Sequence, residues 1–347
     1  MLIRKELLRM KAKLKPILSK YQIGETYTIS ELEDGHTCSI YKVETDNRQY
    51  LLRIRPDFFT EKEIESDHQF LTYLTDRGFP VPELNTTREG NTYGLTDEKR
   101  IFELQSFLPH NKNVTNFDYQ DISSQIARFL GQFHYLSKDY PEKLEKMAYV
   151  GKMPLGFYEK YFDGPLKYGV KRYRETLKSA DGSIKTELDR NIDTLENRLK
   201  EIRAVITKAL PDIPQVVNHN DFYGNNILFQ DNKIAGLVDF DFSSTGIYYI
   251  DLVELMHGSM IWNDDCMPFW GLDSEGKIRV KKGEKDLEIY FKNVGDLYFD
   301  QQIFKEFLIA KVISLAFYPA FDMVDTPEDR LEVTRRLLKT IDRLDNW

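Results

Sequence analysis

The sequence predicts an α+β protein, in which a small lobe with an antiparallel sheet precedes a larger, mainly helical lobe. Short runs rich in Ile, Val, Tyr and Thr, separated by the turn segments EDG and TDNR, fill the N-terminal part and are typical of a β meander. Beyond residue 109, Leu, Ile and Phe recur at steps of three and four, as in helices with one apolar face. The length of 347 residues suits about two such units.

In chain order, the pattern first predicts an amphipathic helix over residues 2–20, which Pro16 kinks or ends early. The small lobe is then expected to contain a helix over residues 61–77 and strands over residues 27–32, 39–44, 49–55, 92–95 and 100–107. The larger lobe is expected to contain helices over residues 121–136 and 184–210, and a hairpin over 226–240 that turns at Asp231 and Asn232. We therefore expect a small lobe over residues 1–102, a hinge over 103–108 and a helical lobe over 109–347.

The composition excludes several classes of function. The chain has 56 acidic and 48 basic residues, a formal charge of −8, and no basic block, which argues against binding nucleic acid or anionic membranes through phosphate neutralisation. Two cysteines are too few for a disulfide framework or a cysteine-based zinc site. No segment approaches the roughly 18 apolar residues of a spanning helix, and the N-terminus lacks a signal-peptide pattern. We expect a cytoplasmic protein whose partner is a small molecule.

The hairpin carries the residues that indicate chemistry. In the segment His219-Asn-Asp-Phe-Tyr-Gly-Asn-Asn226, Asp221 and Asn226 have the D-x4-N spacing of a kinase catalytic loop. Asp239 follows at the end of the returning strand, so a hairpin brings Asn226 and Asp239 together. Phosphoryl transfer needs a carboxylate near the acceptor hydroxyl and ligands for a divalent metal ion, and this segment supplies both.

Two features of the small lobe agree with nucleotide binding. The turn around Gly35 joins two expected strands and is a candidate cover for phosphates through its backbone N–H groups. The next strand carries Arg53 and Arg55 on one face, where a kinase places its phosphate-pairing lysine. The alternative explanation of the two arginines, which we weigh less, is a solvated strand edge.

These segments, in this order, resemble the aminoglycoside-phosphotransferase-like family over residues 25–260. The family's H-G-D-x4-N signature corresponds to the segment that begins at His219, and its I-D-F/W-D/E signature to Val238-Asp239-Phe240-Asp241. A later D-L pair corresponds to Asp251-Leu252. The resemblance implies a protein-kinase-like bilobal fold, with Asp221 as catalytic base and Asn226 and Asp239 as Mg²⁺ ligands. It also implies that His219 braces the loop instead of reacting.

The sequence departs from the family pattern at several positions. Arg53 stands where most relatives have lysine, and either Asp67 or Glu65 on the following helix fits as its acidic partner. Asn220 replaces the usual glycine of the signature, as it does in N-acetylhexosamine kinase-like members. Residues around Glu103 and Gln105 are expected to form the hinge and to bind adenine through backbone groups.

The leading hypothesis is an ATP- and Mg²⁺-dependent kinase that phosphorylates a hydroxyl of an aminoglycoside, an amino alcohol or a sugar. The alternative is a kinase-like protein with little activity that acts in binding or assembly, as is suggested for spore-coat relatives. A protein kinase is disfavoured, because the usual glycine-rich loop and an APE-like segment are missing. The sequence leaves the acceptor, the choice between ATP and GTP, and the oligomeric state open.

Overall fold

The computed structural model describes residues 12–32, 38–114, 119–144, 149–150, 153–154, 162–222, 224–262, 271–317 and 326–347. The chain forms two compact units, the first made of Met1–Lys112 and Ile227–Asp241, and the second of Asn113–Asn226 and Phe242–Trp347. This division differs from the expected one, which ended the small lobe at residue 102 and assigned the whole hairpin to the helical lobe.

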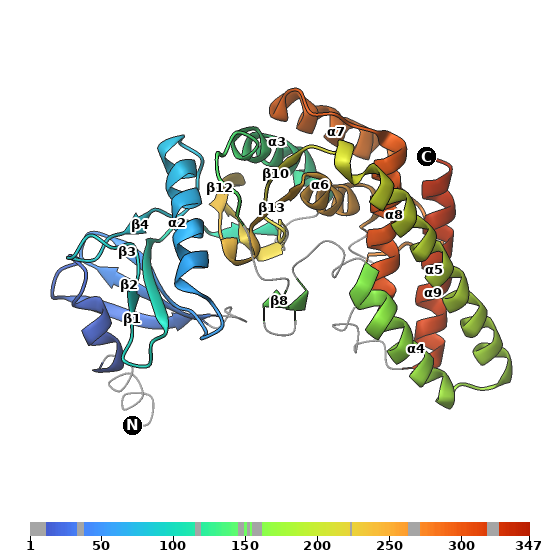
Figure 1. Cartoon of the computed structure of the whole chain (residues 1–347), viewed down its shortest axis with the longest axis horizontal. Helices are drawn as coiled ribbons and strands as arrows, with labels where there is room; N and C mark the ends of the chain where they lie inside the picture. The colour runs from blue at the N-terminus through green and yellow to red at the C-terminus, as the bar shows by residue number, and fades with distance from the viewer. Residues whose placement is uncertain are drawn as a thin grey trace. The chain divides into compact units, whose positions relative to one another are not determined.

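The first unit is built on an antiparallel sheet in the order β1-β2-β3-β6-β4, with β5 also paired to β6 (Figure 1). The strands are β1 (Tyr27–Leu32), β2 (Ser39–Thr45), β3 (Gln49–Ile54), β4 (Leu84–Asn85), β5 (Gly94–Leu95) and β6 (Ile101–Ser106). The described part of the N-terminal helix, residues 12–18, packs Leu14 and Leu18 into the same apolar core as Val43, Leu52 and Leu104. The expected meander is therefore present, with strand bounds close to the expected ones.

One expected boundary needs correction. Residues 103–106 lie in the middle of β6 and are paired with β3, with Glu103 opposite Arg53. Backbone ladder bonds therefore hold these residues in the sheet, so that only residues 107–108 of the expected hinge lie outside a strand.

Helix α2 (Glu61–Asp76) begins at a capping box, at the residue where the sequence pattern predicted the start of a helix over residues 61–77. The Thr60 hydroxyl accepts a hydrogen bond from the Glu63 backbone N–H, and the Glu63 carboxylate accepts one from the Thr60 N–H. The helix buries Ile64, Phe70 and Leu74 on one face. It ends before Gly78, whose φ of 71° is left-handed and suits glycine.

The second unit is mainly helical and contains two short strand pairs. Its α-helices are α3 (Tyr119–Ser137), α4 (Val170–Thr176), α5 (Gly182–Ala209), α6 (Tyr249–Met256), α7 (Val280–Val294), α8 (Gln301–Phe317) and α9 (Pro327–Asp345), and its paired strands are β8 (Tyr149–Val150) with β9 (Met153–Pro154) and β10 (Gln215–Asn218) with β13 (Ser244–Ile247). Helices α5, α8 and α9 pack side by side, as Figure 1 shows, and α3 packs against α7. The apolar stripe of α5 faces inward, since Leu188, Ile192 and Leu195 are fully buried.

The hairpin of β11 (Ile227–Gln230) and β12 (Lys233–Leu237) forms as the sequence predicts. Its two turn residues, Asp231 and Asn232, have φ of 50° and 62°, the left-handed values of a type I′ turn that Asn and Asp tolerate well. The hairpin joins the first unit through the Leu237 N–H, which donates to the Pro80 carbonyl at 3.0 Å. Gly236 allows this approach, because a Cβ there would lie 2.7 Å from the same oxygen.

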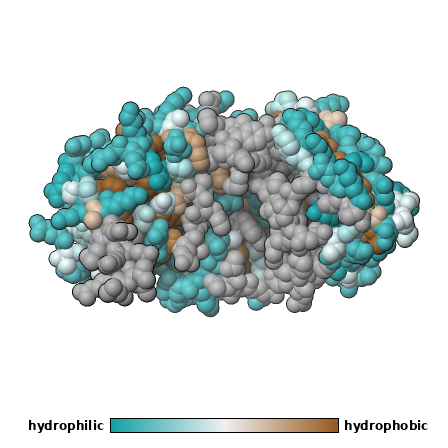
Figure 2. Space-filling model, turned by 90° about the horizontal axis from the view of Figure 1, so that it is seen from below, coloured by the Kyte–Doolittle hydropathy of each residue, from teal (hydrophilic) through white to brown (hydrophobic). Residues whose placement is uncertain are grey.

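The described surface seen in Figure 2 is largely hydrophilic, with small apolar patches among the polar residues. None of the helices in the described ranges is long and apolar enough to cross a bilayer.

Candidate active site

The loop after β10 carries the expected catalytic residue, and a buried carboxylate fixes its backbone. Asp251, at the start of α6, accepts hydrogen bonds from the backbone N–H groups of His219, at 2.7 Å, and Asn220, at 2.8 Å. Directly before the loop, Asn218 is the last residue of β10 and pairs with Ser244 of β13. Both anchors lie in the second unit and fix the backbone at the start of the loop.

The conformation of Asn220 explains its departure from the family signature. Its φ is 63°, in the left-handed region where glycine is the usual residue and asparagine the best-tolerated substitute. Its side-chain amide donates to the Phe242 carbonyl at 2.7 Å and to the Ser244 hydroxyl at 2.8 Å. Asparagine therefore keeps the backbone bend of glycine and adds two anchors to the loop.

Asp221 is partly exposed, and its buried neighbour Phe222 and the side-chain amide of Asn226 fix its position. Phe222 is buried and packs against Phe129 of α3, which fixes the chain direction after Asp221. The Nδ2 amide of Asn226 donates to Asp221 Oδ2 at 2.8 Å and to the Asp221 carbonyl at 3.0 Å. The D-x4-N spacing thus places the two side chains in direct contact.

A buried polar chain extends from this loop into the helices of the second unit. Asp251 Oδ2 lies 3.2 Å from Nε2 of His134 on α3, and Nδ1 of the same ring lies 2.7 Å from the Tyr290 hydroxyl on α7. All three side chains are fully buried. The sequence singled out Asp251 only as part of a D-L pair and gave no sign of His134, because their separation of more than a hundred residues leaves no local pattern.

In the first unit, the other expected metal ligand follows β12 and meets the arginine that the sequence singled out. Asp239 has φ of 66°. Nη2 of Arg53 donates to Asp239 Oδ1 at 2.9 Å and to Asp241 Oδ2 at 2.9 Å. The Arg53 side chain is 6% exposed, whereas that of Asp239 is 36% exposed, so the contact joins a buried cation to a half-exposed carboxylate.

Arg55 lies deeper in the same network. Its Nε and Nη2 donate to the two oxygens of Glu103, at 3.2 and 3.0 Å, and its Nη1 donates to Asp241 at 2.6 Å. Glu103 also contacts His68 of α2, with Nε2 and Oε2 separated by 2.8 Å. Burial alone would raise the pKa of Glu103, but Arg55 first and His68 second hold that pKa well below its ordinary value.

The remaining predicted residues of the nucleotide site lie around this network or outside the described ranges. Gln105 is buried and donates to Glu103 at 3.0 Å, and Glu65 accepts a hydrogen bond from the Tyr93 hydroxyl at 3.0 Å. Asp67 is buried in α2, and its charge contributes to raising the pKa of Arg55. Gly35 lies outside the described residues.

Each expected Mg²⁺ ligand carries an oxygen donor of the kind that Mg²⁺ prefers, Asn226 in the second unit and Asp239 in the first. The Asn226 amide turns its nitrogen toward Asp221, which leaves its oxygen on the opposite side, and amide and carboxylate oxygens are typical Mg²⁺ ligands. Among the described residues in these contacts, two guanidinium groups face the three carboxylates of Glu103, Asp239 and Asp241, so Asp239 is already paired with a protein cation. No group of three or more His, Cys, Asp or Glu side chains in the described ranges could by itself hold a metal ion.

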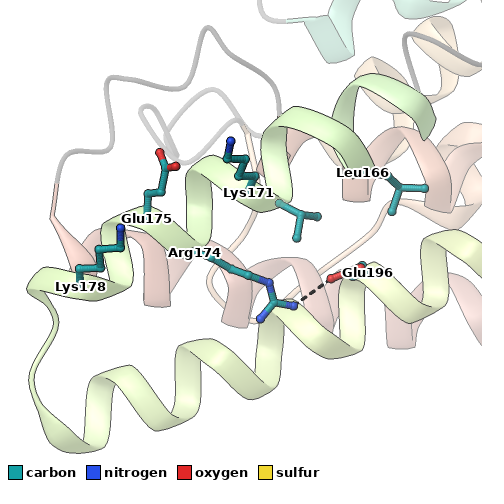
Figure 3. A pocket seen from close by; sticks show the side chains of 7 residues that line it. Leu166, Lys171, Arg174, Glu175, Lys178 and Glu196 are labelled. Carbon is teal, nitrogen blue, oxygen red and sulfur yellow. Dashed lines mark hydrogen bonds and ion pairs between the residues drawn. The ribbon is translucent and has the colours of Figure 1, made fainter.

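The second unit also has a pocket of about 470 Å³ between α4 and α5, shown in Figure 3. Arg174 reaches across it to Glu196 at 2.9 Å, and Lys171 and Glu175 extend from the same helix. The pocket is lined by Leu166, Val170, Lys171, Arg174, Glu175, Lys178 and Glu196. None of these is a residue that the sequence predicted for the site.

Comparison with known proteins assigns the family. Residues 28–280 match the model of the phosphotransferase enzyme family. The chain belongs to this family. The match covers the sheet of the first unit, the loop after β10, the hairpin and helix α6, which are the segments that carried the resemblance in the sequence.

Relatives of this phosphotransferase include named small-molecule kinases. A homoserine kinase of Parvibaculum lavamentivorans is 23% identical over 285 residues, which cover 80% of this chain and 75% of that protein. The structure of a microcompartment-associated aminopropanol kinase has a TM-score of 0.60 at 17% identity, covering 96% of this chain and 95% of that one. An amicoumacin kinase solved with AMP-PNP, Ca²⁺ and Ami has a TM-score of 0.58 at 16% identity, covering 97% and 96%.

These comparisons confirm the expected protein-kinase-like fold, with an antiparallel sheet before a helical part. They also confirm the expectation of a small-molecule kinase at the level of the family. The roles of the individual site residues stay predictions.

Proposed function

We propose that this phosphotransferase transfers the γ-phosphoryl group of ATP to a hydroxyl of a small amino alcohol. The observation that carries the proposal is the partly exposed carboxylate of Asp221 on a loop whose backbone is tied to Asp251. A carboxylate held at a fixed position, with an amide beside it, can orient an acceptor hydroxyl and accept its proton. Such general-base action typically contributes roughly 10² to 10⁴ in rate.

The other site residues take distinct roles in this proposal. Asn226 and Asp239 would hold Mg²⁺, which when bound neutralises the charge of the phosphates. Arg53 would donate hydrogen bonds to phosphate oxygens, for which its two-pronged guanidinium is well suited. Asp221 needs no contact with the nucleotide, so its role is separable from nucleotide binding by substitution.

The relatives favour an amino alcohol among the acceptors that the sequence left open. One similar protein is named homoserine kinase, and one similar structure is named aminopropanol kinase. Both of these acceptors are small, and each carries a hydroxyl and an amine that are separated by two or three carbon atoms. An aminoglycoside or a sugar acceptor is the next class to test, since a structure named aminoglycoside phosphotransferase shares the fold.

The test is a nucleotide-consumption screen with the purified chain, ATP or GTP, and Mg²⁺. The panel contains homoserine, 1-amino-2-propanol, ethanolamine, choline, aminoglycosides, amino sugars and nucleosides, each with a control that omits Mg²⁺. We expect Mg²⁺-dependent ADP formation that rises above background with an amino alcohol. A folded protein that consumes no nucleotide with any acceptor would instead support the alternative, a kinase-like protein that acts in binding or assembly.

A further inference from the structure

The contact between Arg53 and Asp239 places a protein cation at the carboxylate that is expected to bind the metal. Nη2 of Arg53 lies 2.9 Å from Asp239 Oδ1, and Nη1 lies 3.4 Å from Glu103 Oε1. One nitrogen of the guanidinium therefore contacts the buried carboxylate of Glu103, and the other contacts the half-exposed carboxylate of Asp239. A guanidinium and a divalent ion at the same carboxylate repel each other, because both carry positive charge.

The neighbouring arginine is arranged differently. Arg55 binds both oxygens of Glu103 and one oxygen of Asp241, and its side chain is 1% exposed. Each of the three guanidinium nitrogens of Arg55 donates to a buried carboxylate, so Arg55 is fixed in the network. Arg53 instead divides its contacts among Glu103, Asp239 and Asp241, and is the cation that borders the exposed carboxylate.

We propose that Arg53 acts as an internal counter-ion for Asp239, so that the nucleotide-free protein binds bare divalent metal ions poorly and takes up metal together with a nucleotide. Nucleotide phosphates supply the acceptors that attract Arg53 away from Asp239, and the carboxylate then becomes a metal ligand. Arg53 is thus a positioning residue that couples metal binding to nucleotide binding. The proposal rests on the proposed function only for the identity of the second ligand, a nucleoside polyphosphate.

The test measures Mn²⁺ binding to the nucleotide-free protein by electron paramagnetic resonance of the free ion. We expect weak binding by the wild-type chain and an affinity roughly tenfold or more higher in Arg53→Met, since the competing charge is removed. The matched control, Lys42→Met, removes one charge from β2 of the same sheet and should leave Mn²⁺ affinity unchanged. Adding Asp239→Asn to Arg53→Met should abolish the gain.

Circular dichroism establishes that each variant is folded. Arg53→Gln, which keeps hydrogen-bonding capacity without the charge, replaces Arg53→Met if the latter unfolds. An Mn²⁺ affinity that stays unchanged in a folded Arg53 variant would overturn the proposal. So would a wild-type chain that binds Mn²⁺ as tightly without ATP as with it.

Failure of the proposed function gives a different result. A folded wild-type chain that binds no nucleotide with Mg²⁺ would contradict the kinase proposal. The metal-only comparison of Arg53→Met with wild type would still test the contact between Arg53 and Asp239.

Discussion

Asp251 holds the backbone of Asn220: one carboxylate oxygen accepts the Asn220 N–H at 2.8 Å, while the other accepts the preceding N–H at 2.7 Å. Two consecutive amides thus bind one fully buried carboxylate. The next residue along the chain is Asp221, whose orientation depends on this backbone. A change at Asp251 should therefore affect both the stability of the second unit and the orientation of Asp221.

Asp251→Asn tests this link. An amide has one acceptor oxygen, so one of the two backbone N–H groups, of His219 or Asn220, would face an NH₂ group instead. We expect the free energy of unfolding to fall by about 1–3 kcal/mol, the cost of leaving a buried group unsatisfied. Phosphoryl transfer should fall at least about tenfold through loss of alignment.

Urea denaturation and steady-state kinetics measure both effects. The matched control is Asp342→Asn, on the exposed side of α9. An Asp251→Asn protein as stable and as active as the control would show that the loop does not depend on this carboxylate.

Substitutions of Asn220 separate the contribution of its backbone conformation to stability from that of its side-chain hydrogen bonds. Asn220→Gly and Asn220→Ala both lose the side-chain bonds to Phe242 and Ser244, but only glycine accepts φ of 63° without strain. We expect the alanine variant to be less stable than the glycine variant by about 1–2 kcal/mol. Equal stabilities in urea denaturation would contradict a left-handed backbone at this position.

The sequence predicted the features that depend on neighbouring residues. Helix α2 follows from its apolar stripe and from the Gly78 and Pro80 that end it, and the hairpin follows from Asp231 and Asn232, which tolerate left-handed φ. The contact between Asp221 and Asn226 is also local, since the two residues are only five positions apart in the sequence. In each case the residues that decide the structure lie within one turn or one loop.

The features that the sequence did not reveal depend on distant partners. A strand with Arg53 and Arg55 is compatible with a solvated edge until Glu103, fifty and forty-eight residues away, is known to lie opposite. The assignment of the hairpin to the first unit depends on contacts such as that between Leu237 and Pro80. Asp241 has a local signal, its position two residues after Asp239, but its partners are again distant.

Substitutions of the two arginines should have different consequences. Arg53→Ala should raise KM for ATP and lower kcat, because phosphate would lose a ligand and its alignment. Arg53→Lys should restore function only in part, since a point charge cannot reproduce a two-pronged contact. Arg55→Ala should mainly destabilise the first unit, by about 3–5 kcal/mol, because Glu103 would keep a buried charge without its principal cation.

Kinetics and urea denaturation on the three variants separate these effects. A stable Arg55→Ala protein with a large kinetic defect, beside a silent Arg53→Ala, would show that Arg55 binds the phosphate. If both alanine variants had normal kinetics, neither arginine would take part in binding ATP.

His257, at the end of α6, predicts a pH dependence of stability. Burial in the first place, and nearby Lys311 in the second, lower its pKa from 6.5 to about 3, against an opposing effect of Glu254. A depressed pKa means that the unfolded chain binds a proton before the folded one does. This contribution to stability is therefore complete above pH 6.5 and is lost progressively as the pH falls toward 3, by up to about 1.4 kcal/mol per pH unit.

Urea denaturation of wild type and His257→Gln between pH 7.5 and 4.5 measures this contribution. The difference in unfolding free energy between the two proteins should shift in favour of the variant as the pH falls. A difference that stays constant across this range would show that His257 titrates normally in the folded protein.

The central claim is that Asp221 is the base of a phosphotransferase. The most direct measurement compares Asp221→Asn with wild type in γ-phosphoryl transfer from ATP to the acceptor found in the screen, with ATP affinity measured by calorimetry on the same samples. We predict that kcat falls by roughly 10² to 10⁴ while the Kd for ATP with Mg²⁺ stays within a few-fold of wild type. A variant that transfers phosphate at a near-normal rate would contradict the claim.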